Sequence, residues 1–135
     1  MPVINQVKIL LRHNHKYLLL QKRKDVHADH VGGYEVPGGK VKPQEDPISA
    51  VHRELQEETG LLCTILAELI PLTLEKEGIK TATRVFLGNS NSTKINLSSE
   101  HIAFKWVLPE EVDRMENVIY KDLLKKYLVE AETIK

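Results

Sequence analysis

Hydrophobic positions along the chain fall into short runs separated by polar or glycine-containing breaks. Two runs near the start, residues 3–11 and 17–21, are rich in β-branched and aliphatic side chains, and the polar residues 13–16 between them predict a hairpin. The same pattern predicts further extended segments at 34–37, 61–74, 81–87 and 102–108. We expect breaks at a polar loop over 23–33, at Gly38 and Gly39, at a turn over 75–78 and at a polar loop over 88–99.

The clearest helix is predicted from Pro47 to Thr59. Asp46 is a good N-cap, and Pro47 suits the first helical position because its missing N–H costs nothing there. Gly60 can adopt a left-handed conformation and end the helix. The 13 residues between these signals should therefore form one well-bounded helix.

Two further helical segments follow near the end of the chain. Pro109 opens a short helix, and residues 120–130 carry apolar side chains at helical spacing. The strands look joined by hairpins more than by helical crossovers. The pattern therefore indicates a mixed or antiparallel sheet with helices packed on its faces.

Three carboxylates of the 47–59 helix should share one face. With about 100° per residue, Glu54, Glu57 and Glu58 lie within one turn and spread over about 100° of the helix surface. A separate apolar stripe borders them, formed by Ile48, Val51 and Leu55. Ala50 falls inside the acidic face one turn earlier, so we expect space above the carboxylates.

Such a cluster of like charges needs an explanation. Glutamates at these spacings repel each other by a few tenths of a kcal/mol per exposed pair, and the cost grows in a drier site. A divalent cation would reverse the sign, since Mg²⁺ prefers oxygen ligands and is commonly shared with substrate phosphates. The alternative is a solvated acidic face partnered by Arg53, four residues before Glu57.

Composition and charge narrow the classes of function. A chain of 135 residues suits one domain, and 19 basic against 19 acidic residues argue against a strongly basic nucleic-acid binder. Cys63 is the only cysteine, which excludes an internal disulfide and a cysteine-based zinc site. No apolar run approaches the roughly 20 residues of a membrane span, and residues 1–7 lack the features of a signal peptide. We therefore expect a soluble, cytoplasmic protein.

The segment from Gly39 to Leu61 resembles the Nudix hydrolase signature. That signature reads Gly-x5-Glu-x7-Arg-Glu-aliphatic-x-Glu-Glu-x-Gly-aliphatic, and every fixed position is present here. Such a match should occur by chance in about one in ten million chains of this length. Three flanking segments, 17–23, 34–40 and 100–107, also resemble family segments, although Tyr34 stands where the family often has Trp.

The resemblance implies a fold and a reaction. The fold would be α+β, a Nudix-like α/β/α sandwich whose mixed central sheet carries helices on both faces, in a single domain over residues 1–135 with its signature at 39–61. The reaction would be metal-dependent hydrolysis of a phosphoanhydride bond in a nucleoside diphosphate linked to a group X, with Mg²⁺ or Mn²⁺ as cofactor. A MutT-like action on a nucleoside triphosphate fits best.

Other readings of the resemblance stay open. The chain could be a dinucleoside polyphosphate hydrolase, or a Nudix module that senses a nucleotide without turning it over. The neutral charge disfavours messenger-RNA decapping. We expect a small nucleotide as partner, with neither nucleic acid nor membrane, and a homodimer is left open.

The resemblance also implies metal-binding and catalytic residues. The metal ligands would be Glu57 and Glu58 with the backbone carbonyl of Gly38, joined by Glu54 and by Glu100 from the loop before the last strand. Glu54 and Glu100 are the two candidates for the general base, and the choice between them stays open.

Supporting and substrate-binding roles are implied for further residues. Arg53 would pair with a neighbouring acid and fix its rotamer. Glu45 would have a structural role near the helix N-terminus, with contact to the metal as the alternative. Contacts with the substrate phosphates are expected from Arg23, Lys40 and Gly39. His27 and His30 could approach the substrate, His101 could position Glu100, and Phe104 and Trp106 are expected in the core.

Overall fold

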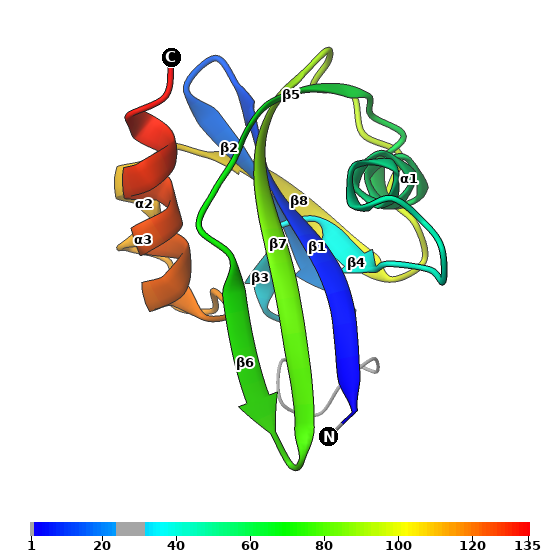
Figure 1. Ribbon diagram of the computed structural model, residues 1–135. Helices are drawn as coiled ribbons and strands as arrows, with labels where there is room; N and C mark the ends of the chain where they lie inside the picture. Colours follow the sequence, from blue (N-terminus) through cyan, green and yellow to red (C-terminus); the bar gives the residue numbers. More distant parts are fainter. Residues whose placement is uncertain (1, 24–31) are drawn as a thin grey trace.

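The computed structural model describes residues 2–23 and 32–135, and within these ranges the chain forms three layers (Figure 1). A mixed sheet lies between α1 (Pro47–Thr59) on one face and α2 (Pro109–Val112) and α3 (Lys121–Glu132) on the other. This is the α+β sandwich that the sequence predicted. Most of the predicted loop at 23–33, with His27 and His30, lies outside the described residues. Among residues 2–23 and 32–135, none of the helices has the length and hydrophobicity that a membrane-spanning helix needs.

Eight strands of the described residues make up the sheet. Their bounds are β1 (Val3–His13), β2 (Lys16–Lys22), β3 (Tyr34–Glu35), β4 (Gly38–Lys40), β5 (Cys63–Glu68), β6 (Leu72–Lys76), β7 (Ile79–Ser90) and β8 (His101–Val107). The predicted β1–β2 hairpin is present, but its pairing is confined to the turn end, and β1 pairs along its length with β7 in parallel. All other strand pairs are antiparallel, so the sheet is mixed as expected.

Several predicted strand boundaries were wrong. The strand expected at 81–87 is β7, which runs from 79 to 90, and β6 includes the first two residues of the turn expected at 75–78. The extended segment at 61–74 is divided into β5 and β6. The break contains Pro71, which has no N–H to give to a ladder. Gly38 and Gly39 do not end an extended segment, because they form β4 and pair with β1. A Cβ on Gly38 would lie 2.1 Å from the carbonyl oxygen of Val7, so only glycine permits this close approach.

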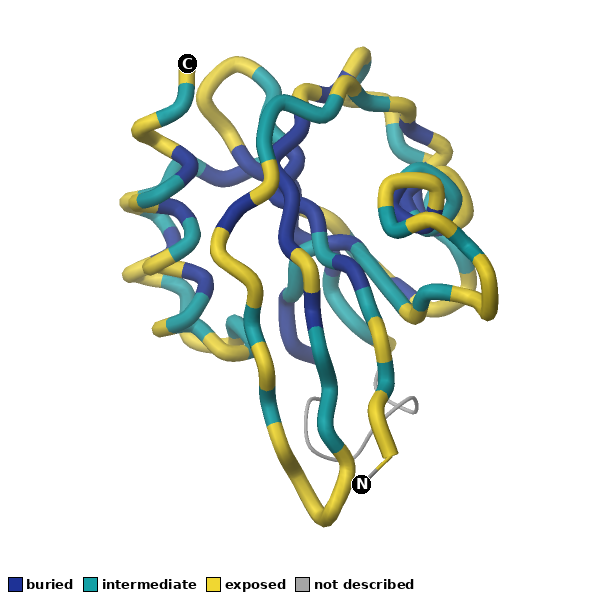
Figure 2. Tube along the Cα trace, in the orientation of Figure 1, coloured by how far each residue is buried: buried dark blue, intermediate teal, exposed yellow. Residues whose placement is uncertain are grey.

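The core consists of two clusters, one on each face of the sheet. Figure 2 shows the buried residues that contribute to them along the central strands and on both α1 and α3. Successive residues of β1 contribute side chains to opposite clusters. Val7 and Ile9 pack toward α1, and Leu10 packs toward α3. Ala50 is fully buried in the α1 cluster, so the expected space above the carboxylates is filled. Ile48 is 42% exposed. The buried face of α1 is thus rotated away from Ile48 and includes Glu58.

The predicted caps of α1 are confirmed. The Asp46 carboxylate accepts a hydrogen bond from the backbone N–H of Ser49 at 3.2 Å. Gly60 has φ of 76°, and its N–H donates to the carbonyl of Gln56. These caps fix where the acidic helix begins and ends between β4 and β5.

Replacing Asp46 by Ala should lower the free energy of unfolding by about 1 kcal/mol, because the N-cap acceptor is lost at an exposed position. Asp46→Asn, which keeps an acceptor oxygen, is the matched control and should stay close to the unmodified protein. Urea denaturation monitored by circular dichroism measures both. An Ala variant as stable as the Asn variant would contradict the capping role.

Candidate active site

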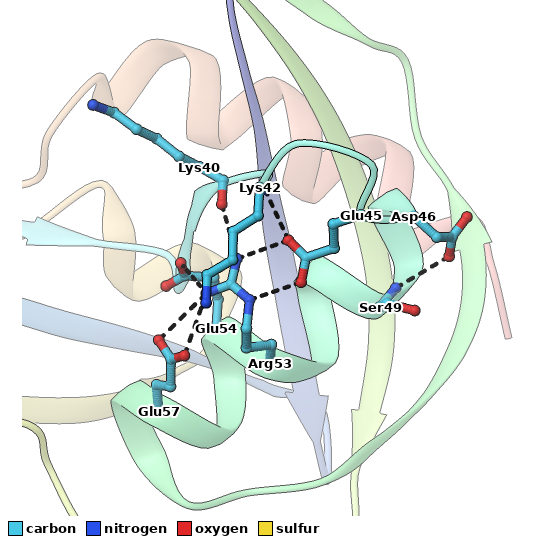
Figure 3. A network of polar contacts seen from close by, with 8 residues as sticks. All are labelled: Lys40, Lys42, Glu45, Asp46, Ser49, Arg53, Glu54 and Glu57. Atoms are coloured by element: carbon cyan, nitrogen blue, oxygen red, sulfur yellow. Dashed lines mark hydrogen bonds and ion pairs between the residues drawn. The ribbon is translucent and has the colours of Figure 1, made fainter.

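Arg53 in the middle of α1 bonds to three glutamates, one in the loop before the helix and two in its second half (Figure 3). Its Nε and Nη2 donate to both carboxylate oxygens of Glu45, at 2.7 and 2.9 Å. Its Nη1 donates to Glu54 at 2.9 Å and to Glu57 at 3.3 Å, and Nη2 also reaches the carbonyl of Lys40 at 2.9 Å. The expected pairing of Arg53 with a neighbouring acid is therefore present and extends to three acids and to β4.

Glu45 ties the loop before α1 to this network. The hydrogen bonds from Arg53, with one from the backbone N–H of Lys42, hold the pKa of Glu45 at about 2. Glu45 is thus an ionised acceptor that the guanidinium and the loop backbone share. These contacts agree with a structural role for this residue.

Glu58 is the most buried of the helix carboxylates, with a side chain 6% exposed. Its Oε1 accepts a hydrogen bond from the N–H of Gly38 at 3.0 Å. Burial raises the pKa of Glu58 to about 8, and the nearby charge of Glu54 adds to the rise, against the hydrogen bond from Gly38 and the charge of Lys8. Ionised Glu58 is therefore costly unless a cation lies beside it.

The raised pKa of Glu58 predicts a pH-dependent stability. The folded-state pKa of Glu58, about 8, exceeds its ordinary value of 4.5. Its contribution to the free energy of unfolding is therefore fully present below pH 4.5 and is lost as the pH rises through 8. The side chain of Glu58→Gln cannot ionise. As the pH rises from 5 to 8 without metal, the free energy of unfolding of this variant should therefore increase relative to that of the unmodified protein, by an amount on the order of a few kcal/mol. Urea denaturation at several pH values in EDTA measures the gap. A gap that does not change with pH would show that Glu58 titrates normally.

The backbone of Gly38 and Gly39 in β4 directly contacts carboxylates of α1. A Cβ on Gly39 would lie 2.4 Å from Cδ of Glu54, so the bare backbone lies directly on this carboxylate. Burial raises the pKa of Glu54 despite Arg53, and the charges of Glu57 and Glu100 also raise it. Glu100 therefore lies on the side of the site where Glu54 is. Glu57 stands at the rim, with a side chain 56% exposed.

The donor set along β4 and α1 fits a hard divalent cation. Carboxylate oxygens and a backbone carbonyl are the ligands that Mg²⁺ and Mn²⁺ prefer. In the described part of the chain, no three His, Cys, Asp or Glu side chains already form a group that could hold a metal. Arg53 draws Glu54 and Glu57 to itself, while Glu58 turns to Gly38. A cation would bind by drawing these carboxylates together.

The expected phosphate-binding residues lie at the edges of the site. Arg23 is exposed, and its side chain and backbone N–H donate to the carbonyls of Ser99 and Glu100. Lys40 is exposed as well, and its side chain extends away from Arg53 (Figure 3). Gly39 is in β4 beside Glu54. Arg23 thus joins the end of β2 to the loop that carries Glu100.

A cavity of about 250 Å³ lies on the α3 face of the sheet, and no residue of α1 is among those that line it. Its walls include the charged residues Lys8, Lys22 and Glu35 and the apolar side of α3 at Leu123 and Tyr127. The sequence interpretation assigned no role to the three charged residues. The available signal was a charge inside an apolar run, as at Lys8 between Val7 and Ile9.

Glu35 is the polar centre of this cavity wall. The ammonium groups of Lys8 and Lys22 lie 3.5 and 3.6 Å from its Oε1, and Nε2 of His101 lies 3.1 Å from its Oε2. Burial opposes ionisation, but these three partners outweigh it and lower the pKa of Glu35 to about 2. His101 thus faces Glu35 and Glu58, not Glu100 as the sequence suggested.

A larger cavity, of about 620 Å³, lies between the start of β1 and the loop before α1. Glu45 is among its lining residues, whereas Glu54, Glu57 and Glu58 are not. Both cavities reach β4 or its register partners on β1, at Lys40 in the larger and at Lys8 in the smaller. The smaller cavity is the better candidate for a substrate because its wall includes Glu35, which His101 links to Glu58. Of the two residues of β8 that were expected in the core, Trp106 packs against the core cluster on the α1 face, as predicted. The prediction for Phe104 was wrong, because that side chain is exposed.

Comparison with known proteins identifies relatives along most of the chain. A NUDIX domain family model matches residues 4–127. The crystal structure of a MutT protein from Methanosarcina mazei Go1 superposes with a TM-score of 0.84 at 30% identity, over 96% of each chain. A CTP pyrophosphohydrolase of Escherichia coli (strain K12) is 37% identical over 65 residues, 48% of this chain and 47% of that protein. An 8-oxo-dGTP diphosphatase of Proteus vulgaris is 41% identical over 59 residues, 41% of this chain and 49% of that protein. The matched parts span about half the length of these two curated relatives.

Proposed function

The chain belongs to the Nudix hydrolase family, and from this premise we propose that it hydrolyses a phosphoanhydride bond in a nucleoside diphosphate linked to another group, with Mg²⁺ or Mn²⁺. One observation carries the proposal: the bare backbone of β4 lies against two buried or half-buried carboxylates of α1, Glu54 and Glu58, beside a cavity with two lysines. Oxygen donors next to a cationic pocket suit a metal-bound polyphosphate.

Five residues would hold the metal: the carboxylates of Glu54, Glu57, Glu58 and Glu100, with the carbonyl of Gly38. A divalent ion held there would neutralise charge on the phosphate oxygens and make water easier to deprotonate. Arg53 keeps Glu54 and Glu57 in place through its hydrogen bonds. Arg23, Lys40 and the backbone of Gly39 would contact phosphate oxygens from the rim.

A nucleoside triphosphate is the substrate class that we favour. Lys8 and Lys22 give the cavity two ammonium groups for a phosphate chain or a polar base edge, and Leu123 and Tyr127 give it an apolar wall for a base. The names of the relatives, a CTP pyrophosphohydrolase and an 8-oxo-dGTP diphosphatase, agree with this class. A dinucleoside polyphosphate is the alternative with the same reacting bond.

The general base is one of two carboxylates. Glu54 is half-buried against Gly39, and Glu100 is exposed on the neighbouring loop. Replacing the base by Gln should lower kcat by about 10²–10⁴ and remove the acidic limb of the pH–rate profile, whereas the other variant should keep that limb. Profiles of Glu54→Gln and Glu100→Gln distinguish the two. An intact acidic limb in both variants would exclude this pair.

The function itself is tested by a product-resolved screen. Purified protein with Mg²⁺ or Mn²⁺ should release a nucleotide from at least one nucleoside triphosphate, dinucleoside polyphosphate or nucleotide sugar, and EDTA should stop the reaction. Water labelled with heavy oxygen then identifies the phosphorus that is attacked. Tight nucleotide binding without turnover across the whole panel would favour the sensing module and contradict the hydrolase.

A further inference from the structure

One buried ring joins the cavity wall to the acidic helix. His101 is the first residue of β8, and its side chain is 2% exposed. Its Nε2 lies 3.1 Å from Oε2 of Glu35, and its Nδ1 lies 3.9 Å from Oε2 of Glu58. Glu35 belongs to the cavity wall and Glu58 to α1. His101 is therefore placed between the two groups that a substrate and a metal would use.

Glu35 fixes the ring on its outer side. An ionised carboxylate only accepts hydrogen bonds, so Nε2 of His101 is the donor in this contact. The backbones on both sides are held by the sheet, since β2 pairs with β3 at Glu35 and with β8 at His101. The orientation of the ring is thus set independently of α1.

The inner nitrogen of the ring has no such partner. Nδ1 is buried without a hydrogen bond, which is generally unfavourable for a polar atom. It faces Oε2 of Glu58, while the other oxygen of that carboxylate accepts the N–H of Gly38. A movement of Oε2 by about 1 Å toward the ring would bring the pair within hydrogen-bond distance.

We propose that His101 is a positioning residue for Glu58. Held by Glu35 through Nε2–H, a ring that carries a proton on each nitrogen donates from Nδ1–H to the second oxygen of the Glu58 carboxylate, as the N–H of Gly38 donates to the first. This rests on the proposed function, in which Glu58 is a metal ligand. Ligating carboxylates are generally hydrogen-bonded themselves, and the loss of such a partner weakens metal binding by about 10- to 100-fold.

Three substitutions at position 101 separate this role from simple packing. Asn places an amide near the Nδ1 position, Gln reaches toward Glu35 in place of Nε2, and Phe fills the volume without a polar atom. Calorimetric titration with Mn²⁺ alone should give H101N an affinity within about threefold of the unmodified protein. H101Q and H101F should bind about 10- to 100-fold more weakly and show a lower kcat with an unchanged KM.

A double substitution tests whether the effect passes through Glu58. In an E58Q background, H101F should cause no further loss of Mn²⁺ affinity, because the two residues act as one unit. Equal Mn²⁺ affinity of H101F, H101Q and the unmodified protein, or the same loss with and without Glu58, would overturn the positioning role. If thermal melting shows that H101F is unfolded, the Mn²⁺ affinities of H101N and H101Q decide instead. Equal affinities of these two variants would overturn the positioning role.

The two proposals fail in different ways. An active unmodified protein whose Mn²⁺ affinity is unaffected by all three substitutions overturns the role of His101 alone. An unmodified protein that neither binds Mn²⁺ nor hydrolyses any nucleotide in the screen overturns the proposed function, and the role of His101 with it.

Discussion

Glu58→Gln is expected to lower kcat for nucleotide hydrolysis by about 10³ while the fold stays intact. The amide has nearly the same volume, and its oxygen can still accept the N–H of Gly38, which Glu58 binds at 3.0 Å. It cannot supply the negative charge that would balance a divalent cation. Glu57→Gln should have a similar effect on kcat with even less structural cost, because that side chain is largely exposed.

Kinetics with saturating Mg²⁺ and circular dichroism measure this pair of variants. Glu75→Gln is a matched control, since Glu75 is an exposed acid on β6 outside the site. It should leave both kcat and the melting temperature unchanged. Full activity in both Glu57→Gln and Glu58→Gln would remove the proposed metal ligands.

Arg53→Ala is expected to reduce both activity and stability. The substitution leaves Glu45, Glu54 and Glu57 without their shared cation and releases the carbonyl of Lys40. We expect kcat to fall by about 10², and the free energy of unfolding to fall by about 1–2 kcal/mol because the network is only partly shielded from solvent. Arg53→Lys keeps the positive charge but not the planar guanidinium group. Its kcat and its free energy of unfolding should therefore lie between those of Arg53→Ala and those of the unmodified protein.

Arg84 offers a matched control for this prediction. It also makes two hydrogen bonds to one carboxylate, both at 2.7 Å to Glu68, but both side chains are exposed and Glu68 is on β5, not on the acidic helix. Arg84→Ala should change the free energy of unfolding by less than about 1 kcal/mol and leave kcat unchanged. Urea denaturation and steady-state kinetics compare the two variants. An Arg53→Ala protein that behaves like Arg84→Ala would show that the network does not position the site.

The features set by neighbouring residues could be predicted from the sequence. Asp46 and Gly60 bound α1 because a cap acts on backbone groups a few residues away. The spacing of Glu54, Glu57 and Glu58 follows from the helical period in the same way. The mixed character of the sheet was also predictable, although the parallel pairing of β1 with β7 joins segments that are far apart in the sequence.

The features that depend on distant contacts could not be derived in this way. The helical wheel placed Ala50 among the acids, but packing against Val7 and Ile9 rotates the buried face of α1 toward Ala50 and Glu58. The contact of Glu35 with His101 arises only when β3 and β8 both pair with β2. The local sequence around Glu35 or His101 therefore does not predict that the two side chains are in contact.

Paramagnetic broadening of backbone amide signals by Mn²⁺ tests the metal site most directly. Small additions of Mn²⁺ to nitrogen-15-labelled protein should first broaden the amides of Gly38 and Gly39 and those of residues 54–58, and Glu58→Gln should weaken this effect. Broadening that begins elsewhere, with these amides unaffected, would contradict a metal site between β4 and α1.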